Sequence, residues 1–288
     1  MQVQPADAVS VIIPVFGRQE SLGAALRSAL AQLGPRDEIL VVDDGSSPAI
    51  TLPDIPAPRA PVRLIRSDRN RGAAGARNLG IDEATKPLIA FLDSDDFWMD
   101  GKLAAQKRLL ADQPDEMVAI ACGWQETEGG AVVRRRVPLA SRTRSDFFAG
   151  CWFCPGTTLL IRRAVFQACG PLPEGLRRLE DLEWFLRFAM LGGRLLVADI
   201  LGASIARGGN ARPDAVEDAA RRILDGVAAL PGVSARERGD LLAYLDLERA
   251  AAHGNVGRRL AQAYFLAKSL MRRPRLTIPL QNWWRNPV

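Results

Sequence analysis

The chain has 288 residues, a formal net charge of +5, and 48% hydrophobic and 25% charged side chains, which fits one large globular domain or one domain with an appendage. The excess of basic residues favours anionic ligands such as nucleotides or lipid phosphates, but aromatic residues make up only 6% and no RNA-binding motif is present, so we expect no nucleic-acid partner. No run of 18 apolar residues occurs, and we therefore expect no membrane-spanning helix.

The first fifty residues have the pattern of a strand, a helix and a second strand. Residues 9–14 are a β-branched run that ends in proline, and apolar residues at helical spacing follow over residues 21–33. Residues 38–42 are a second apolar run, which leads directly into Asp43 and Asp44. This order predicts a right-handed parallel crossover, with the two acidic residues at the carboxyl end of the second strand.

A third short strand is expected at residues 62–66, and a helix rich in glycine and alanine at residues 70–84. Five apolar residues at 88–92 then run straight into Asp93. Because an ionised carboxylate is costly to bury without a partner, this strand is expected to end there, at the edge of the sheet where α/β proteins bind ligands. Asp93 and Asp95, two positions apart, suit a hard divalent cation such as Mg²⁺ or Mn²⁺. The alternative is an acidic turn that only caps the next helix.

The middle of the chain predicts a helix followed by an antiparallel hairpin. An amphipathic helix is expected at residues 100–113, and two strands, at residues 118–124 and 131–137, flank the turn pair Gly129-Gly130. Three consecutive arginines at 134–136 lie on the second strand. We interpret them as a solvated edge that resists aggregation, with contact to an anionic acceptor as the alternative.

The segment after the hairpin brings two further acidic residues to the start of a helix. Glu180 and Asp181 directly precede a predicted helix at residues 182–191. The helix dipole favours acidic side chains at this position, so N-capping alone would explain them. A last strand is expected at residues 195–205, followed by Arg207.

Nucleophilic and metal–thiolate chemistry have little support in this sequence. The pair Cys151 and Cys154 has the spacing C-x-x-C but no second pair at zinc spacing, and the single histidine, His253, lies far along the chain. We therefore expect structural thiols, and no Ser-His or Cys-His catalysis. Any acid–base chemistry falls to aspartate or glutamate.

From Pro213 onward the composition changes to alanine, arginine and leucine, without a strand signal. Three helices are expected, at residues 213–230, 235–253 and 256–272. The tail at residues 272–288 is basic and contains the pair Trp283-Trp284. Such a tail is typical of a membrane interface; the alternative is that the tryptophans pack back onto the rest of the protein.

Five motifs follow one another between residues 9 and 210. They are V-S-V-I-I-P-V-F at 9–16 with Arg18 and Glu20 behind it, V-V-D-D-G-S-S at 41–47, N-R-G-x-x-x-A-R-N at 70–78, F-L-D-S-D-D at 91–96 and E-D-x-x-x-x-L-R at 180–187. In this order they resemble glycosyltransferase family 2, whose members have the GT-A nucleotide-sugar fold. The C-terminal helices are not covered by the resemblance.

The resemblance implies an α/β fold of the GT-A type, a Rossmann-like and mostly parallel mixed sheet flanked by helices, with a C-terminal helical appendage. It implies a catalytic domain at residues 1–212, in which residues 1–98 bind the nucleotide sugar and residues 99–212 hold the acceptor and the catalytic part. Residues 213–288 would then form a helical region with a basic tail that contains tryptophan.

By the same resemblance, Asp181 is the catalytic base with Glu180 as its acidic neighbour, and Asp93 and Asp95 form the D-x-D that holds Mn²⁺ or Mg²⁺ on the diphosphate. Asp43 is expected to accept a hydrogen bond from the uracil imide. The residues implied to bind the nucleotide sugar are Pro14, Phe16, Arg18, Glu20, Asp43, Arg77, Asp93, Ser94, Glu180 and Arg207. Many family members have a histidine directly after the arginine that corresponds to Arg207. The present chain has Gly208 at that position, so a histidine metal ligand is missing here.

The implied activity is inverting transfer of a sugar from a UDP- or dTDP-sugar to a hydroxyl group by single displacement, in bacterial surface polysaccharide or glycoconjugate synthesis. The expected acceptor is a glycan or a lipid-linked glycan, and the expected location is the cytoplasm, at the inner face of the cytoplasmic membrane, with a homodimer also considered. Two alternatives are a non-catalytic nucleotide-sugar-binding scaffold and a nucleotidyltransferase. A nucleotidyltransferase would have a Gly-rich triphosphate loop after the first strand, and this sequence has no such loop there.

Overall fold

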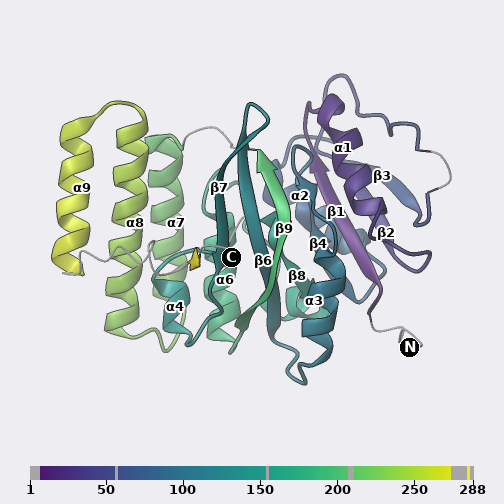
Figure 1. Cartoon of the computed structure of the whole chain (residues 1–288). Coiled ribbons are helices and arrows are strands. Elements are labelled where there is room, and N and C mark those ends of the chain that lie inside the picture. Colours follow the sequence, from purple (N-terminus) through teal and green to yellow (C-terminus); the bar gives the residue numbers. More distant parts are fainter. Residues whose placement is uncertain (1–6, 56–57, 154–155, 207–210, 274–283, 286–288) are drawn as a thin grey trace.

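The computed structural model describes residues 7–55, 58–153, 156–206, 211–273 and 284–285, the last two by their backbone alone. A mixed β-sheet runs through the middle of the molecule, helices pack on both of its faces, and three further helices stand side by side beyond one end of it (Figure 1). This arrangement confirms the predicted α/β fold with a C-terminal helical appendage.

The first part of the chain forms a parallel four-stranded unit. Its elements are β1 (Val9–Val15), α1 (Gln19–Leu30), β2 (Glu38–Asp43), β3 (Val62–Arg66), α2 (Gly72–Glu83) and β4 (Leu88–Phe91). The strand order is β3-β2-β1-β4, and all three pairings are parallel. Val11 and Ile13 of β1 pack with α1, whereas Ile12 packs with α2. The carboxyl ends of these strands therefore meet at one edge.

Helix α2 lies unusually close to the sheet. A Cβ atom placed on Gly80 would come within 2.4 Å of Cγ2 of Ile12 in β1. Because no side chain fits into that space, the small residues of α2 set its distance from β1. The glycine- and alanine-rich composition of α2 permits this close packing, and the start of α2 lies at the same edge of the sheet as the acidic turns.

The second part of the chain extends the sheet with mixed pairings. Its elements are β5 (Phe97–Trp98), α3 (Lys102–Ala111), β6 (Val118–Glu128), β7 (Ala131–Pro138), α4 (Ser145–Phe148), a 3-10 turn (Gly156–Thr158), β8 (Leu160–Arg162), α5 (Arg163–Cys169), α6 (Glu180–Met190) and β9 (Arg194–Ala206). β8 runs antiparallel to β4 and β6, and β6 pairs parallel with β9 and antiparallel with β7. The predicted hairpin is confirmed. The acidic turn after β4 does not cap a helix, because β5 follows it and pairs with β9.

The C-terminal helices are α7 (Pro213–Ala229), α8 (Ala235–Asn255) and α9 (Arg259–Arg272), close to the predicted positions. α7 and α8 share a hydrophobic cluster with α4 and α6, to which Phe148, Leu182, Ile223 and Leu241 contribute. α9 is the outermost helix of the three (Figure 1). Because one apolar cluster joins the appendage to the rest of the protein, α8 has a fixed place relative to α6.

After α9 the chain returns to the sheet. The backbone of β10 (Trp284–Arg285) pairs antiparallel with Val137 and Pro138 of β7. The described strands thereby form one ten-stranded sheet in the order β10-β7-β6-β8-β4-β1-β2-β3, with β9 paired to β6 and β5 paired to β9. The position of Trp284 agrees with the alternative in which the tail packs back onto the protein, while Trp283 lies outside the described residues. Within the described residues, no helix combines the length and the hydropathy needed to cross a bilayer.

Candidate active site

Two adjoining cavities lie at the edge of the sheet where the parallel strands end. The first has a volume of about 410 Å³ and is lined from the ends of β1 and β4 and the start of α2. The second has a volume of about 550 Å³ and is lined from the β6–β7 hairpin, the start of α6 and helix α8. Arg77, Asp93 and Glu180 line both cavities. Ligands bound in the two cavities would therefore meet at these three side chains.

The first cavity collects most of the residues predicted to bind a nucleotide sugar. Besides the three shared residues, its lining includes Pro14, Phe16, Arg18, Asp44, Asn70, Gly72, Ser94 and Asp95. The ring of Phe16 is 53% exposed, so an aromatic face is available for stacking with a base. The cavity thus combines an aromatic surface, a carboxylate pair and a basic side chain.

The two acids that end β2 have different surroundings. Asp43 is buried, and its carboxylate accepts hydrogen bonds from the backbone N–H groups of Ser46 (2.9 Å) and Ile50 (3.2 Å) and pairs with Arg66. Burial alone would raise the pKa of Asp43, but these hydrogen bonds and the ion pair outweigh it and lower the pKa. Asp43 therefore holds its own loop together and does not line the first cavity.

Asp44, the next residue, does line the first cavity. Its carboxylate accepts hydrogen bonds from the backbone N–H groups of Arg71 and Gly72, both at 2.8 Å. Burial raises the pKa of Asp44 against the effect of these two bonds. Asp44 thereby connects the end of β2 to the start of α2, and it is the acid of this pair that lines the cavity.

The acidic turn after β4 directs two carboxylates into the first cavity. Nη2 of Arg77 donates to Oδ1 of Asp93 at 2.8 Å, and Arg18 pairs with Oδ2 of Asp95. The side chains of Asp93 and Asp95 are 30% and 29% exposed. Each carboxylate has a second oxygen, and hard oxygen ligands are those that Mg²⁺ and Mn²⁺ prefer.

A divalent cation therefore fits this pair of carboxylates as part of a larger ligand set. The described residues contain no group of three histidine, cysteine, aspartate or glutamate side chains that could hold a metal ion by itself. Asp93 and Asp95 would hold it together with phosphate oxygens and water, which is the usual way in which Mg²⁺ binds to nucleotides.

Asp96, the third acid of the turn, has a structural role. Its buried carboxylate accepts hydrogen bonds from the hydroxyl of Thr157 (2.6 Å) and from the backbone N–H of Ala206 (3.0 Å). The same hydroxyl oxygen accepts a hydrogen bond from the backbone N–H of Asp93 at 3.1 Å. Burial and the nearby charge of Asp93 raise the pKa of Asp96 to about 8. Asp96 thus fixes the acidic turn relative to the end of β9.

Arg77 forms the centre of the wall between the cavities. Its side chain is 5% exposed and lies 2.8 Å from Oδ1 of Asp93, 3.5 Å from Oε1 of Glu180 and 3.9 Å from Oδ1 of Asp181. Burial would lower the pKa of Arg77, but the attraction of these three carboxylates outweighs it and raises the pKa. A single buried guanidinium therefore lies between the acids of β4 and α6, hydrogen-bonded to Asp93 and within ion-pair distance of Glu180 and Asp181.

The start of α6 is positioned by its backbone and by packing. Leu179, directly before the helix, has φ = 60°, a left-handed conformation that costs a leucine roughly 1–2 kcal/mol. Burial and the neighbouring charge of Asp181 raise the pKa of Glu180. The helix is anchored by the aromatic cluster Phe147, Phe153, Trp184, Phe185 and Phe188. Glu180 and Asp181 are therefore held at the cavity wall by a rigid helix.

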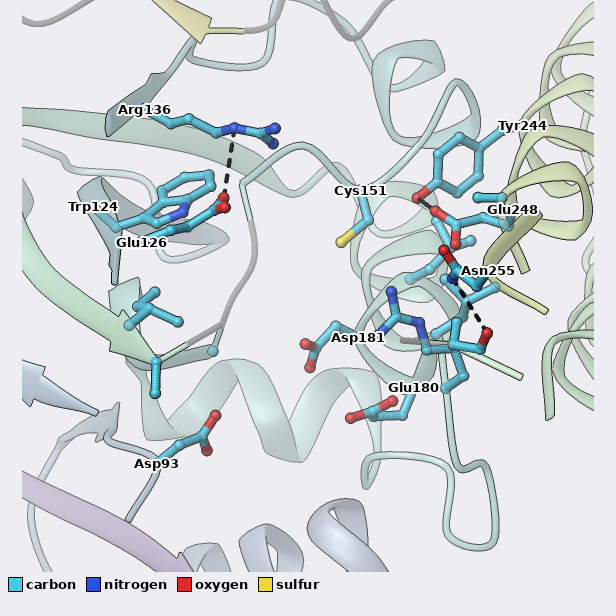
Figure 2. A pocket seen from close by; sticks show the side chains of 18 of the residues that line it. Asp93, Trp124, Glu126, Arg136, Cys151, Glu180, Asp181, Tyr244, Glu248 and Asn255 are labelled. Carbon is cyan, nitrogen blue, oxygen red and sulfur yellow. Dashed lines mark hydrogen bonds and ion pairs between the residues drawn. The ribbon is translucent and has the colours of Figure 1, made fainter. Parts of the chain in front are cut away.

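The second cavity lies between the sheet and the appendage. Figure 2 shows Asp181 pointing into the space between Trp124 and Glu126 on the sheet side and Tyr244 and Glu248 on the α8 side. The hydroxyl of Tyr244 donates to Oε1 of Glu248 at 2.7 Å. The lining residues of α8 are Tyr244, Glu248, Ala251 and Asn255. Their spacing of four, three and four residues places them on one face of the helix.

Arg136 links the hairpin to the second cavity. It lines the cavity and lies 3.7 Å from Oε1 of Glu126, whereas Arg134 is half exposed and lies 3.7 Å from the other oxygen of the same carboxylate. Burial lowers the pKa of Arg136. The solvated-edge interpretation of the three arginines therefore agrees with the exposure of Arg134, while Arg136 lines the cavity.

The structure brings together most of the predicted site residues, namely Pro14, Phe16, Arg18, Arg77, Asp93, Ser94, Asp95, Glu180 and Asp181. Glu20 is exposed on α1 and lines neither of the two cavities. Arg207 lies outside the described residues. Asp44 and Asn70 were missed although both stand inside recognised motifs, whereas no sequence signal pointed to the cavity residues of α8.

Comparison with known proteins assigns the family. The model of the family described as Glycosyl transferase family 2 matches residues 10–170, which is more than half of the chain. The chain belongs to glycosyl transferase family 2. The match contains three of the five motifs in full and all but the first residue of a fourth, and the site residues at the start of α6 follow it closely in the sequence.

Two similar bacterial proteins have names that state glycosyl transfer. The Escherichia coli protein named UDP-Glc:alpha-D-GlcNAc-diphosphoundecaprenol beta-1,3-glucosyltransferase WfgD is 37% identical over 102 residues, which cover 35% of this chain and 40% of that protein. The amylovoran biosynthesis glycosyltransferase AmsB of Erwinia amylovora is 28% identical over 166 residues, which cover 54% of this chain and 55% of that protein. In both cases the chain spans less than two thirds of the relative's length.

Solved structures support the fold. The crystal structure of S. aureus TarS 1-349 has a TM-score of 0.65 and 17% identity, and the match covers 93% of this chain and 81% of that one. The TarS 1-349 complex with UDP-GlcNAc has the same TM-score at 18% identity, and the match covers 92% and 81% of the two chains. At this identity the likeness concerns the fold alone, and it confirms the predicted GT-A architecture.

Proposed function

We propose that this chain is an inverting glycosyltransferase that moves a sugar from a UDP- or dTDP-sugar to a hydroxyl group in the synthesis of a bacterial surface polysaccharide or glycoconjugate. Family membership and the names of the relatives support this class of reaction. The observation that carries the proposal is the position of Asp181, next to the wall that two adjoining cavities share and pointing into the second of them (Figure 2).

In this proposal the first cavity receives the donor. Phe16 offers a stacking surface and Asp44 a carboxylate for the nucleoside, while Arg18 and Asp95 lie together where a diphosphate would bind. The sugar would then lie beside Arg77 and Glu180, the residues that also line the second cavity. This orientation directs the anomeric carbon toward the acceptor.

Asp93 and Asp95 would hold the divalent cation, and Asp95 is the closer of the two to the diphosphate-binding Arg18. When bound, the cation would supply Lewis-acid stabilisation of the charge that develops on the leaving diphosphate. The chain's own cations act in the same direction, because Arg18 and Arg77 place positive charge at the boundary of the donor cavity.

The acceptor would occupy the second cavity with its hydroxyl near Asp181. Asp181 takes the hydroxyl proton while the oxygen forms a bond to the anomeric carbon, and the bond to the diphosphate breaks on the opposite face, which inverts the configuration. A carboxylate base of this kind contributes roughly 10²–10⁴-fold to the rate. Arg77 places a positive charge 3.9 Å from Oδ1 of this carboxylate.

The second cavity also supports the expected class of acceptor. Arg136 and Arg178 bring positive charge to a cavity that Trp124, Glu126 and Asn255 line as well. Such a mixture suits a glycan that carries a phosphate group, because guanidinium groups bind phosphate and the polar groups bind hydroxyls. The name of WfgD specifies a diphosphoundecaprenol-linked sugar, and we extend this acceptor class to the present chain.

Substitution of the base tests the proposal directly. We expect Asp181→Asn to lower sugar transfer roughly 100-fold or more, because an amide cannot accept the proton. Nucleotide-sugar binding, measured by thermal shift with a panel of UDP- and dTDP-sugars, should remain close to that of the unaltered protein. Transfer is measured as release of the nucleoside diphosphate in the presence of glycan and lipid-linked acceptors.

Glu183→Gln is the matched control, because Glu183 stands in the same first turn of α6 but pairs with Arg187 and lines neither cavity. We expect it to retain transfer. Retained transfer in Asp181→Asn would contradict the assignment of the base. Binding of donors without turnover in the unaltered protein would favour the non-catalytic scaffold.

A further inference from the structure

Helix α9 contacts the rest of the protein with only one of its faces. The hydroxyl of Ser269 donates to the backbone carbonyl of Ala243 on α8 at 2.8 Å, and the ring of Phe265 stacks on His253 with 5.4 Å between ring centres. The opposite face carries exposed apolar side chains, which are Leu260, Tyr264, Leu270 and Met271. The helix is thus apolar on the side that points away from α8.

The exposure of this face is exceptional within the molecule. Leu260 is 90% exposed, Met271 77% and Tyr264 59%, and these are the three most exposed large apolar side chains in the described part of the chain. At 100° per residue, positions 260, 264 and 271 fall on one face, and the small residues Ala263 and Ala267 lie between them. A stripe this apolar on the outermost helix indicates a binding surface.

The charges around this face all have one sign. The segment from residue 256 to residue 288 contains seven basic and no acidic residues, more than the net charge of +5 of the whole chain. Two of the basic residues are neutralised, because Arg272 pairs with Asp246 (3.1 Å) and Arg273 with Asp240 (3.3 Å) of α8. Among the described residues, Arg258, Arg259 and Lys268 pair with no acidic side chain. The apolar stripe is therefore flanked by unneutralised cations.

We propose that α9 docks this chain onto an anionic lipid bilayer. The stripe of Leu260, Tyr264 and Met271 would lie between the headgroups and the acyl chains, with Arg259 and Lys268 on the lipid phosphates, as in other interfacial amphipathic helices. A second copy of the chain is a poorer occupant, because pairing two such faces would bring like charges together.

The proposal differs from a membrane contact through the tryptophan-containing tail, because the backbone at Trp284 is paired with β7. It also has a consequence for the active site. Tyr244 and Glu248 line the second cavity from α8, the helix on which α9 packs. Docking through α9 would hold that cavity near lipid-linked acceptors, a consequence that rests on the proposed function, whereas the docking itself does not.

Sedimentation of the full chain with lipid vesicles tests the inference. We expect binding to phosphatidylcholine vesicles that contain phosphatidylglycerol, weak binding to phosphatidylcholine alone, and loss of binding at high salt. The combined change Leu260→Gln, Tyr264→Gln and Met271→Gln should weaken vesicle binding roughly tenfold or more. The combined change Arg259→Glu and Lys268→Glu should remove the preference for phosphatidylglycerol.

The control changes Val133→Gln and Leu191→Gln, which are exposed apolar residues elsewhere, should leave vesicle binding unchanged. Unaltered melting temperatures and unaltered nucleotide-sugar thermal shifts show that the α9 variants are folded. Failure of the unaltered chain to bind anionic vesicles would overturn the proposal, and so would undiminished binding by the α9 variant. A dimer in sedimentation velocity that this variant dissociates, without vesicle binding, would identify a self-association face instead. None of these readouts depends on sugar transfer.

Discussion

Single residues at the active site are fixed by a balance of charge. Arg77 is surrounded by the carboxylates of Asp93, Glu180 and Asp181, whereas Asp95 has its own partner in Arg18. The three acids around one guanidinium leave excess negative charge, which a cation or the basic side chains near a bound donor can offset. Of Asp93 and Asp95, Asp95 is therefore the one that can change its partner without breaking a contact of Arg77.

This difference leads to a prediction about metal dependence. We expect Asp95→Ala to lower the Mn²⁺-dependent gain in UDP affinity roughly tenfold or more, because one of the two carboxylate ligands is lost. Isothermal titration of UDP with and without Mn²⁺ measures this gain. Asp115→Ala, which removes an exposed pair with Arg194, is the control and should behave like the unaltered protein. A full metal response in Asp95→Ala would exclude this residue as a ligand.

The sequence predicted single residues well where a motif and a strand end coincide. Asp93 and Asp95 were found in this way, because a carboxylate that directly follows a buried apolar run needs a partner or a ligand at the edge of the sheet. Which of two adjacent acids lines the cavity could not be predicted, since the direction of each side chain at the end of β2 decides between Asp43 and Asp44. Thr157 could not be found, because its hydroxyl acts on Asp96, 61 positions away in the sequence.

At the scale of elements, the start of α8 is held by a capping box that also reaches the catalytic part of the chain. The hydroxyl of Ser234 accepts from the backbone N–H of Glu237, and the carboxylate of Glu237 accepts from the backbone N–H of Ser234. The same carboxylate pairs with Arg144 at 2.9 Å. Burial would raise the pKa of Glu237, but Arg144 and Ser234 outweigh it and lower the pKa to about 2.

The lowered pKa predicts a pH dependence for Glu237→Gln. The stabilisation from Glu237 is fully present above its ordinary pKa of 4.5 and is lost as the pH falls through the folded pKa of about 2. We expect the variant to lose on the order of 2–3 kcal/mol of unfolding free energy at neutral pH, and less as the pH falls below 4.5. Urea unfolding at several pH values measures this. Glu217→Gln, which removes a carboxylate that is 61% exposed and pairs with Arg249, should cost at most about 1 kcal/mol; an equal loss in both variants would contradict the argument.

Elements themselves were predictable where their periodicity is strong. The strands of the parallel unit, the hairpin and all three C-terminal helices lie close to their predicted ranges, because each has a clear apolar run, helical period or turn signal in the sequence. β5 was missed because two residues, Phe97 and Trp98, show no period, and its strand character comes from pairing with Ala203 and Ser204 of β9. Long-range pairing of this kind overrides local propensity.

At the scale of the whole molecule, the appendage is part of the site. α7 and α8 share an apolar cluster with α4 and α6, and one face of α8 closes the second cavity opposite the hairpin. The sequence could not show this, because the family resemblance ends near Asn210 and the polar face of α8 looks like an ordinary solvated surface. Tertiary packing alone turns Tyr244 and Asn255 toward Asp181.

A bulky residue on this face of α8 should therefore block the acceptor without affecting the donor. Ala251 is exposed and lines the second cavity but not the first. We expect Ala251→Trp to lower the kcat/KM for the acceptor roughly tenfold or more. The indole would occupy part of the second cavity and displace the acceptor hydroxyl from its reactive position. UDP-sugar binding should not change. Ala228→Trp, on an exposed part of α7 that lines neither cavity, is the matched control. Unimpaired transfer in Ala251→Trp would mean that the acceptor reaches Asp181 by a route that does not pass α8.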